Sequence, residues 1–398
     1  MVTAQEALNI ILSSVNPMAK ERIGLRDAHS RVLAENIVAE ENIPPFDNSS
    51  MDGFAVCADD VAKPPVVLTV VDEVTAGKVS SHEGRRGEAI RIMTGGQIPR
   101  GADAVVQIEW TEAVDDHHVR IQKSVSVGHN IRRAGEDVER GKTVLEAGRE
   151  LRASGFGVLA SLGRKSVEVY GIPRVAILAT GNELVNINEP LGPGKIRDSN
   201  SFTLRALVLE AGAVPLDLGI APDHREEIRT KILLGLEADV LVTSGGVSVG
   251  AYDLVHEVLK EIGVEIKFWK VNIKPGMPLL FGIYGSKPVF GLPGNPVSTM
   301  VTFLKFVKPA LQRMKGIGKP ESEFRLRAQL VEDIRKADGK RHFLRGVLET
   351  QNGALQVKRT GPQSSGVFSS LVQANCLIVI PEQVELLKKG DVVEVELL

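Results

Sequence analysis

The chain of 398 residues is long enough for roughly two to four domains, and its 43% hydrophobic and 25% charged residues are typical of a soluble globular protein. A formal net charge of −2 and an aromatic content of 4% give no reason to expect a nucleic-acid partner. The two cysteines, Cys57 and Cys376, are too few for a disulfide framework or a thiolate zinc site.

The first residues contain neither the basic stretch nor the apolar core of a signal peptide. No apolar run reaches the roughly 20 residues that a helix needs to span a bilayer. We therefore expect a cytoplasmic protein that does not enter the membrane. Thr3 and Glu6 fit a capping box, and apolar residues follow at helical spacing, which predicts a first helix of about a dozen residues.

The segment after this helix is rich in predicted strands. Residues 22–39 predict a short strand, a short helix and a strand, too small a set to form a core alone. β-Branched residues between turn residues then predict strands at 66–71, 88–93, 104–109 and 118–122. We expect a β-rich inserted domain at 45–140 and a small linking domain formed by 20–44 and 141–170.

Three later stretches share one order, in which an apolar strand is followed by a glycine-containing loop and a helix-like run. The strands lie at 174–180, 239–243 and 287–292, and Pro296 suits the first turn of the last helix. This repetition predicts a doubly wound parallel sheet whose loops meet at the carboxyl edge, where ligands bind. We assign residues 1–19 and 171–318 to this α/β domain.

Residues 319–398 are predicted to form a separate all-β domain. Its candidate strands lie at 324–332, 342–349, 354–359, 376–380 and 391–397. Asn352-Gly353 is a hairpin-turn signal between two of them. We expect a small barrel or sandwich, and a chain of α/β and β domains overall.

Three carboxylates follow strands of the predicted parallel sheet. Glu183 lies in the first loop, Asp223 follows a strand at 214–220, and Asp253 closes the glycine loop. Carboxylates among phosphate-binding elements predict a divalent ion such as Mg²⁺. Each also has a structural reading, since Asp223 and Asp253 could cap helices and Glu183 could be a solvated loop residue.

Two lysines, Lys270 and Lys274, lie four residues apart, and on an extended strand they would face the same side. Both ammonium groups could then bind one anion, with backbone N–H groups of Gly245, Gly246 and Gly294 as further donors. The same lysines could instead form an exposed strand face. The combination predicts a phosphate-bearing ligand, a metal and a second oxyanion, but it does not name the ligand.

Motifs across nearly the whole chain make the assignment more specific. Residues 44–55 read Pro-Pro-Phe-Asp-Asn-Ser-Ser-Met-Asp-Gly-Phe-Ala, and further motifs follow at 92–95, 130–137, 180–184, 244–253, 270–278, 291–298 and 361–365. In this order they resemble the molybdopterin molybdenumtransferases, a family that includes the bacterial MoeA type and the E domain of gephyrin.

The resemblance implies the last step of molybdenum cofactor assembly. In that step, molybdate or tungstate is inserted into adenylylated molybdopterin and AMP is released, with Mg²⁺ as cofactor. It also implies a homodimer of elongated subunits, with a cleft between the sheet domain of one subunit and the inserted domain of the other. A transient contact with the adenylyltransferase that makes the substrate fits this picture.

Site residues follow from the same resemblance. The catalytic residues would be Asp52, Glu183, Asp223, Asp253, Lys270 and Lys274, of which Glu183, Asp223 and Asp253 would bind the metal. The substrate-binding residues would be Thr94, Arg133, Asp137, Gly245, Gly246, Ser248, Gly294, Asn295, Pro296 and Ser365. Asp52 and Thr94 would act from across the dimer.

One residue departs from the family pattern. Many relatives have Lys-Pro-Gly-Lys-Pro, whereas this chain has Met277 in Lys274-Pro275-Gly276-Met277-Pro278. The edge of the predicted oxyanion site therefore has one cation fewer. This leaves the choice between molybdate and tungstate open. Two other functions also remain open: a molybdopterin adenylyltransferase, whose single domain resembles residues 171–318, and a non-enzymatic scaffold of the gephyrin type.

Overall fold

The computed structural model describes residues 1–246, 254–318 and 325–398. The chain divides into two compact units. Unit 1 comprises Met1–Ala34, Gly148–Leu151 and Val167–Leu398, and unit 2 comprises Glu35–Ala147 and Arg152–Ser166. The residues predicted to form a linking domain fall partly in each unit, and the division into four domains stays a prediction.

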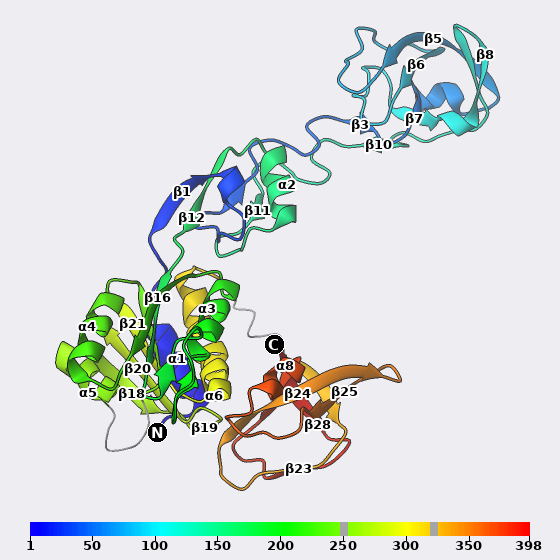
Figure 1. Cartoon of the computed structure of the whole chain (residues 1–398). Coiled ribbons are helices and arrows are strands. Elements are labelled where there is room, and N and C mark those ends of the chain that lie inside the picture. The colour runs from blue at the N-terminus through cyan, green and yellow to red at the C-terminus, as the bar shows by residue number, and fades with distance from the viewer. Residues whose placement is uncertain (247–253, 319–324) are drawn as a thin grey trace. The chain divides into compact units, whose positions relative to one another are not determined.

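A six-stranded sheet forms the centre of the α/β part of unit 1 (Figure 1). In spatial order its strands are β16 (Val214–Ala221), β13 (Arg174–Thr180), β17 (Val240–Ser244), β21 (Lys287–Leu292), β20 (Pro278–Tyr284) and β18 (Glu265–Lys270). The first four strands run parallel, and β20 runs antiparallel to both of its neighbours. The predicted doubly wound sheet is confirmed, with one antiparallel strand added.

Helices cover both faces of this sheet, because successive side chains of a buried strand point to opposite sides. Val175 and Ile177 pack against α1 (Ala4–Ser14), α3 (Asn200–Glu210) and the helical run of α6 (Pro296–Thr302), a π-helical turn (Phe303–Val307) and α7 (Lys308–Met314). Ala176 and Leu178 pack against α4 (Arg225–Gly235) and α5 (Leu254–Ile262). Figure 1 shows α4 and α5 on one side of the sheet and α1, α3 and α6 on the other.

The first helix forms as its sequence predicts. The Glu6 N–H donates to Thr3 Oγ1 at 3.2 Å, and the Thr3 N–H donates to Glu6 Oε2 at 2.8 Å, which completes the capping box. Ala7 and Ile11 lie one turn apart and are fully buried in the core that the sheet forms with α3 and α7. This N-terminal helix is therefore part of the α/β core.

The C-terminal part of unit 1 is a closed barrel and not a sandwich, the other form that the sequence allowed. β24 (Arg341–Gln351), β25 (Ala354–Arg359), β22 (Leu326–Leu330), β28 (Val392–Leu397) and β26 (Cys376–Ile380) pair in that order, and β26 pairs back with β24. β19 (Ile273–Lys274), from the sheet part of the chain, adds to the outside of β24 in parallel. The smaller elements are β23 (Ile334–Arg335), β27 (Leu386–Leu387) and α8 (Ser369–Gln373).

Unit 2 is built on another six-stranded sheet. Its spatial order is β7 (Ala104–Gln107), β4 (Gly53–Val56), β6 (Glu88–Ile92), β5 (Val66–Val74), β9 (His118–Ile121) and β8 (Thr111–Asp115). The sequence reading missed β8, because its side chains are mostly exposed and polar and so lack the alternation of a half-buried strand. Two short ladders and a helix complete the unit: β2 (Ile37–Val38) with β11 (Thr143–Leu145), β3 (Asn48–Ser49) with β10 (Ile131–Arg132), and α2 (Ala153–Ser161).

Four further strands form two short ladders. β1 (Lys20–Gly24) pairs with β12 (Ser166–Tyr170), and β14 (Leu184–Val185) pairs with β15 (Ile196–Arg197) in the loop after β13.

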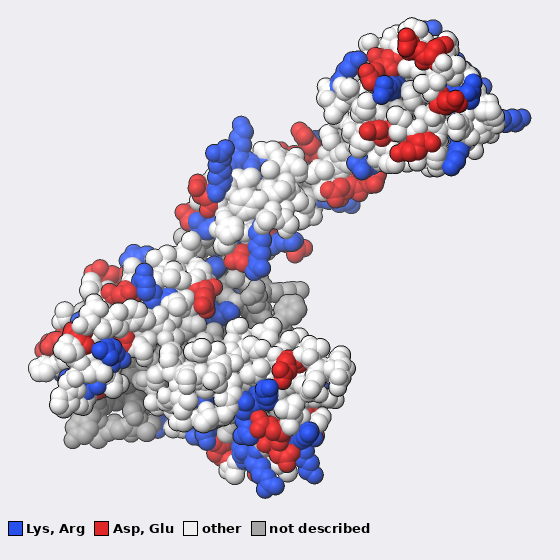
Figure 2. Space-filling model, turned by 45° about the vertical axis from the view of Figure 1, so that its right-hand side comes forward, with Lys and Arg blue, Asp and Glu red and all other residues white. Residues whose placement is uncertain are grey.

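On the face drawn in Figure 2, positive and negative side chains are interspersed over both units. Within the described residues, no helix combines the length and apolar character needed to cross a membrane.

We predict that Ile11→Ala lowers the free energy of unfolding of the α/β part by about 3 kcal/mol, because it leaves a cavity in the packed core. Ile11 is fully buried, whereas Asn9 of the same helix is exposed. Urea unfolding followed by circular dichroism measures the change. Asn9→Ala is the matched control and should shift the midpoint little; equal shifts for the two variants would contradict the packing of α1 described above.

Candidate active site

A cavity of about 460 Å³ lies at the carboxyl ends of β13, β17 and β21. This volume falls within the roughly 300–1,000 Å³ of small-molecule sites. The three strands are parallel neighbours, so the loops that follow them converge although they are far apart in the sequence. Seven of the residues predicted for the site line this cavity: Glu183, Asp223, Gly245, Gly246, Gly294, Asn295 and Pro296.

The backbone is packed too tightly here for a side chain at Gly245. This residue has a φ of +93°, and a Cβ atom would lie 2.4 Å from the Thr180 carbonyl oxygen. Its N–H donates to the Leu292 carbonyl at 3.1 Å. The prediction that this N–H would bind an anion is therefore wrong, because the group is already committed to joining two strand ends.

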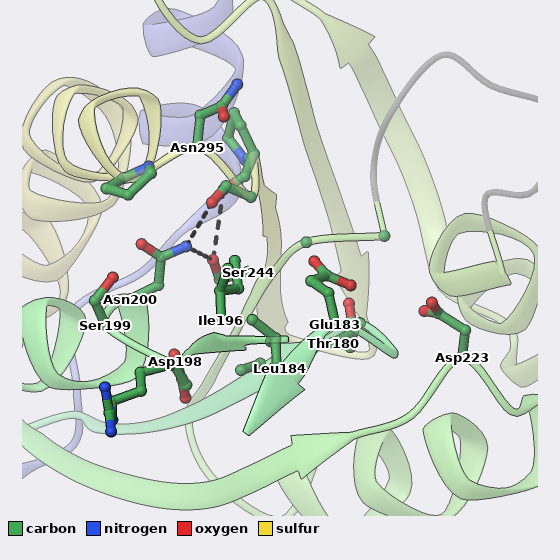
Figure 3. Close-up of a pocket in the computed structure, with 18 of the residues that line it drawn as sticks. Thr180, Glu183, Leu184, Ile196, Asp198, Ser199, Asn200, Asp223, Ser244 and Asn295 are labelled. Carbon is green, nitrogen blue, oxygen red and sulfur yellow. Dashed lines mark hydrogen bonds between the residues drawn. The ribbon is translucent and has the colours of Figure 1, made fainter. Parts of the chain in front are cut away.

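Two of the predicted carboxylates reach the cavity from neighbouring loops. Figure 3 shows the carboxylates of Glu183 and Asp223 on the same side of the cavity as Thr180. Asn182 fixes Asp223 from both sides, since its N–H donates to Asp223 Oδ2 at 3.1 Å and its Oδ1 accepts from the Asp223 N–H at 3.0 Å. The residue that precedes α4 is His224, so Asp223 does not cap that helix. The predicted Ser248 and Asp253 lie outside the described residues.

The sequence reading missed the polar residues at the start of α3. Asn200 donates from Nδ2 to Ser244 Oγ and to the Gly294 carbonyl, both at 2.8 Å, so it joins the second and third loops (Figure 3). Asp198 is 5% exposed and accepts from the Ser201 N–H at 3.0 Å. Asp-Ser-Asn before an apolar-periodic run was the available signal, but the same pattern begins many ordinary helices.

The geometric argument for the two lysines is wrong in its premise. β18 ends at Lys270, and Lys274 belongs to β19 in a different sheet, so the segment is not one extended strand. The Lys270 ammonium lies 5.7 Å from the ring centroid of Trp269. The Lys274 ammonium contacts the barrel instead. Neither lysine lines the described cavity, although Pro278, which closes their motif, does.

Lys274 is held by Asp338 from the loop before β24, and Asp338 is held in turn by His342 of β24. Its Nζ lies 3.2 Å from Asp338 Oδ2, and His342 Nε2 lies 2.8 Å from Asp338 Oδ1. Burial opposes ionisation of Asp338, but the hydrogen bonds from His342 and Lys274 outweigh it and hold the pKa of Asp338 at about 2. Burial lowers the pKa of His342. Asp338 therefore stays ionised as the partner of Lys274.

A buried arginine of the barrel holds the loop that contacts the start of α6. Arg345 is fully buried and donates to the Ser370 hydroxyl and to the carbonyls of Pro362, Gln363 and Ser364 at 2.9–3.2 Å. The next residue, Ser365, accepts from the Val297 N–H through its carbonyl at 3.3 Å. This places the predicted Ser365 at the start of α6, beside the cavity. Arg345 was missed because a lone arginine in a strand has no recognisable pattern.

The predicted residues of unit 2 have hydrogen-bond partners within that unit. Asp52 Oδ1 accepts from the Thr94 N–H at 2.7 Å and from Thr94 Oγ1 at 2.8 Å, and these bonds lower the pKa of Asp52. Arg133 Nη1 donates to Asp47 Oδ2 at 2.6 Å. The Ala134 N–H bond and the Arg133 charge lower the pKa of Asp47. Asp137 donates from its N–H to the Ile43 carbonyl at 3.0 Å.

The oxygen atoms around the cavity suit a hard cation in kind but not in number. Glu183 and Asp223 offer carboxylates, and the buried Thr180 Oγ1 has no hydrogen-bond partner within the described part of the chain. Among residues 1–246, 254–318 and 325–398, no three His, Cys, Asp or Glu side chains are grouped to hold a metal. A Mg²⁺ ion could bind here with two carboxylates if substrate phosphates and water supplied the remaining ligands.

Comparisons with known proteins cover the whole length of the chain. Residues 2–163 match the family model of the MoeA N-terminal region (domains I and II), residues 176–313 match a probable molybdopterin binding domain, and residues 327–398 match the MoeA C-terminal region (domain IV). A molybdopterin molybdenumtransferase of Haemophilus influenzae is 37% identical over 399 residues, which is 100% of this chain and 98% of that protein. One of Bacillus subtilis is 37% identical over 386 residues, 95% of this chain and 90% of that protein.

A solved structure shares the architecture as well. The molybdopterin biosynthesis MoeA protein of Pyrococcus horikoshii OT3 superposes with a TM-score of 0.86 at 35% identity and covers 100% of both chains. A molybdenum cofactor biosynthesis protein of Pyrococcus furiosus has a TM-score of 0.61 at 24% identity over 100% of both chains, which supports the fold.

We predict that Asp338→Asn destabilises the folded chain by about 1 kcal/mol near neutral pH, because it removes a partner of Lys274 and His342. The folded pKa of Asp338 is about 2, below its ordinary value of 3.8, so the carboxylate stabilises the fold above about pH 4. Its contribution is lost as the pH falls from about 4 to about 2.

Urea unfolding midpoints of the wild type and the variant, measured from about pH 7 to about pH 3, test this dependence. The difference between the two proteins should shrink toward the acid end. Asp391→Asn serves as the control, since its carboxylate accepts one backbone hydrogen bond on the barrel surface. A difference for Asp338→Asn that stays constant down to pH 3 would rule out the assigned ion pair.

Proposed function

Because this chain belongs to the family of molybdopterin molybdenumtransferases of the MoeA type, we propose that the cavity at the carboxyl ends of β13, β17 and β21 binds adenylylated molybdopterin. The protein is a transferase of molybdenum cofactor biosynthesis. Its reaction is the final step of that pathway, in which molybdate is inserted into adenylylated molybdopterin and AMP is released.

One observation carries the assignment of the cavity. Loops from three parallel strands bring carboxylates, hydroxyls and glycine backbone together around about 460 Å³, at the edge where such sheets bind phosphate-bearing ligands. Gly294 leaves space for a phosphate to approach the backbone, since a Cβ atom there would meet only the Gly245 Cα at 3.7 Å, and the helical run that starts at Pro296 adds the positive end of its dipole. We therefore propose that the nucleotide and the pyrophosphate of the substrate bind here.

The reaction breaks the pyrophosphate bond and needs an oxygen nucleophile at phosphorus, from water or from molybdate. Glu183 and Asp223 would hold a Mg²⁺ ion, which neutralises phosphate charge when it is bound. Asn182 keeps Asp223 in one orientation. Asn200 keeps the loops after β17 and β21 at a fixed separation, so the groups that bind phosphate are set before the substrate arrives.

We place the second oxyanion, molybdate, near Lys274. Asp338 and His342 set the position of the Lys274 ammonium, and this side chain is 60% exposed, so an anion can reach it. Asp52, Thr94 and Arg133 of unit 2 would complete the site from the partner subunit of a homodimer. Asp137, Asp253, Lys270, Ser248 and Ser365 keep the roles that the family resemblance implies.

The setting of the enzyme is also part of the proposal. We expect a cytoplasmic homodimer that receives its substrate from an adenylyltransferase, with a transient contact between the two proteins. The adenylyltransferase alternative accounts for the sheet domain alone and leaves the family matches at 2–163 and 327–398 without a role. Tungstate is the alternative to molybdate as the inserted oxyanion.

We predict that Lys274→Ala lowers molybdate-dependent AMP release by at least roughly a hundredfold, because a positioned cation at the oxyanion is lost. The assay follows AMP released from adenylylated molybdopterin with Mg²⁺, in titrations of molybdate and of tungstate. Lys267→Ala is the matched control: Lys267 lies on β18, the strand that precedes Lys274 in the chain, and pairs with the exposed Glu265 at 2.6 Å.

The folded state of both variants is checked by their unfolding midpoints. Activity of Lys274→Ala at the level of Lys267→Ala would refute the role of Lys274. Absence of oxyanion-dependent release by the wild type, together with tight binding of the nucleotide, would favour the adenylyltransferase or a scaffold.

A site shared between two subunits predicts that the variants Asp52→Asn and Glu183→Gln restore activity in mixed dimers. Each variant alone should be inactive. After unfolding and refolding of an equal mixture, half of the dimers are mixed and one of their two sites has no substitution, so activity should return to about a quarter of the wild type. No recovery, with mixed dimers demonstrated by mass spectrometry, would place both residues in the same subunit's site.

A further inference from the structure

Met277 occupies the position at which many relatives have the second lysine of the motif, and a lysine from the barrel lies beside it. Lys340 belongs to the loop that leads into β24, and its Nζ lies 3.4 Å from Met277 Sδ. A lysine at position 277 would carry its ammonium two atoms beyond the place of this sulfur. The cation that the motif lacks is therefore present in space, although it comes from a residue 63 positions later in the chain.

The loop that carries Lys340 is docked in a defined register. Asn272 Nδ2 donates to the Gly339 carbonyl at 2.9 Å, and the Arg341 N–H donates to the Asn272 carbonyl at 3.1 Å. The Lys340 N–H also reaches Asp338 Oδ1 at 3.3 Å. Backbone contacts on both sides of Lys340 thus hold its Cα against the segment that contains Lys274 and Met277.

The Lys340 ammonium forms no ion pair with another group in the part of the chain that the structure describes. A thioether is a weak acceptor, so its contact with Met277 leaves the ammonium ready for an anion. Within the described residues, Lys340 has no carboxylate partner, whereas Asp338 is already engaged by Lys274 and His342. Lys340 is half-buried, and Pro278, the residue after Met277, lines the cavity.

We infer that Lys340 is an oxyanion-binding residue, which together with Lys274 forms a two-cation rim at the entrance for molybdate. The inference rests on the proposed function and names a residue of the barrel as part of its oxyanion site. The competing reading is that Lys340 covers Met277 with its aliphatic stem and has no contact with substrate.

The test is Lys340→Met, which keeps an unbranched apolar stem and removes the charge. The KM for molybdate in the AMP-release assay should rise roughly tenfold, as expected for one cation near an anion at a partly exposed site, while kcat changes little. Met277→Lys in the Lys340→Met background returns the cation to the same place and should restore most of the affinity. Lys358→Met is the control, because it removes a barrel lysine that pairs with Glu349.

Each outcome supports or overturns the oxyanion-binding role of Lys340. A raised KM that Met277→Lys rescues supports the inference, and a KM equal to that of Lys358→Met overturns it. A loss of thermal stability with an unchanged KM assigns Lys340 to packing and also overturns it. If the wild type releases no AMP in response to molybdate, the proposed function itself fails, and direct binding of molybdate to the wild type and to Lys340→Met by calorimetry decides whether the rim still binds an oxyanion.

Discussion

The convergence of three parallel strand ends is the constraint on which the cavity depends. β13, β17 and β21 end side by side, and the Gly245 N–H joins the last two ends through the Leu292 carbonyl. A Cβ atom at Gly245 would lie 2.4 Å from the Thr180 carbonyl oxygen, so this approach exists only with glycine. Apart from Pro278, which begins the antiparallel β20, the cavity residues lie on loops that leave from these ends or from the neighbouring β16, whose last residue precedes the Asp223 loop.

In the barrel, a buried arginine holds in place a loop that contacts the α/β part. Arg345 is buried with no carboxylate partner among the described residues, and it is stabilised by carbonyl and hydroxyl acceptors that surround its guanidinium. Removal of the arginine would leave several buried acceptors without a donor, which is costly in an apolar interior. Its hydrogen bonds fix the loop whose Ser365 carbonyl meets the start of α6. Arg345 of the barrel thereby helps to position the start of α6, which lies beside the cavity of the α/β part.

Sequence patterns predicted the fold well where they reflect burial. The runs 174–180, 239–243 and 287–292 are apolar because both faces of the sheet are covered, and this pattern indicates parallel strands. β8 was missed because its residues are exposed, and the barrel could not be told from a sandwich because closure depends on the pairing of β24 with β26, which no local pattern encodes. For the site, glycines and carboxylates after strands were visible, whereas Asn200, Arg345 and Asp338 act through partners distant in sequence. The lysine argument failed because two residues, Val271 and Asn272, interrupt the strand.

The two-residue ladder between β19 and β24 constrains how this protein can evolve. It pairs Ile273 with Arg341 and Lys274 with His342, so the sheet segment and the barrel segment share one register. An insertion or deletion of one residue in the loop between β23 and β24 would shift this register and turn alternate side chains to the opposite face. The two segments therefore cannot drift independently: the length of an exposed loop is tied to the geometry of a lysine motif more than sixty positions away. Exchange of the barrel between relatives would succeed only when both partners of the ladder are exchanged together.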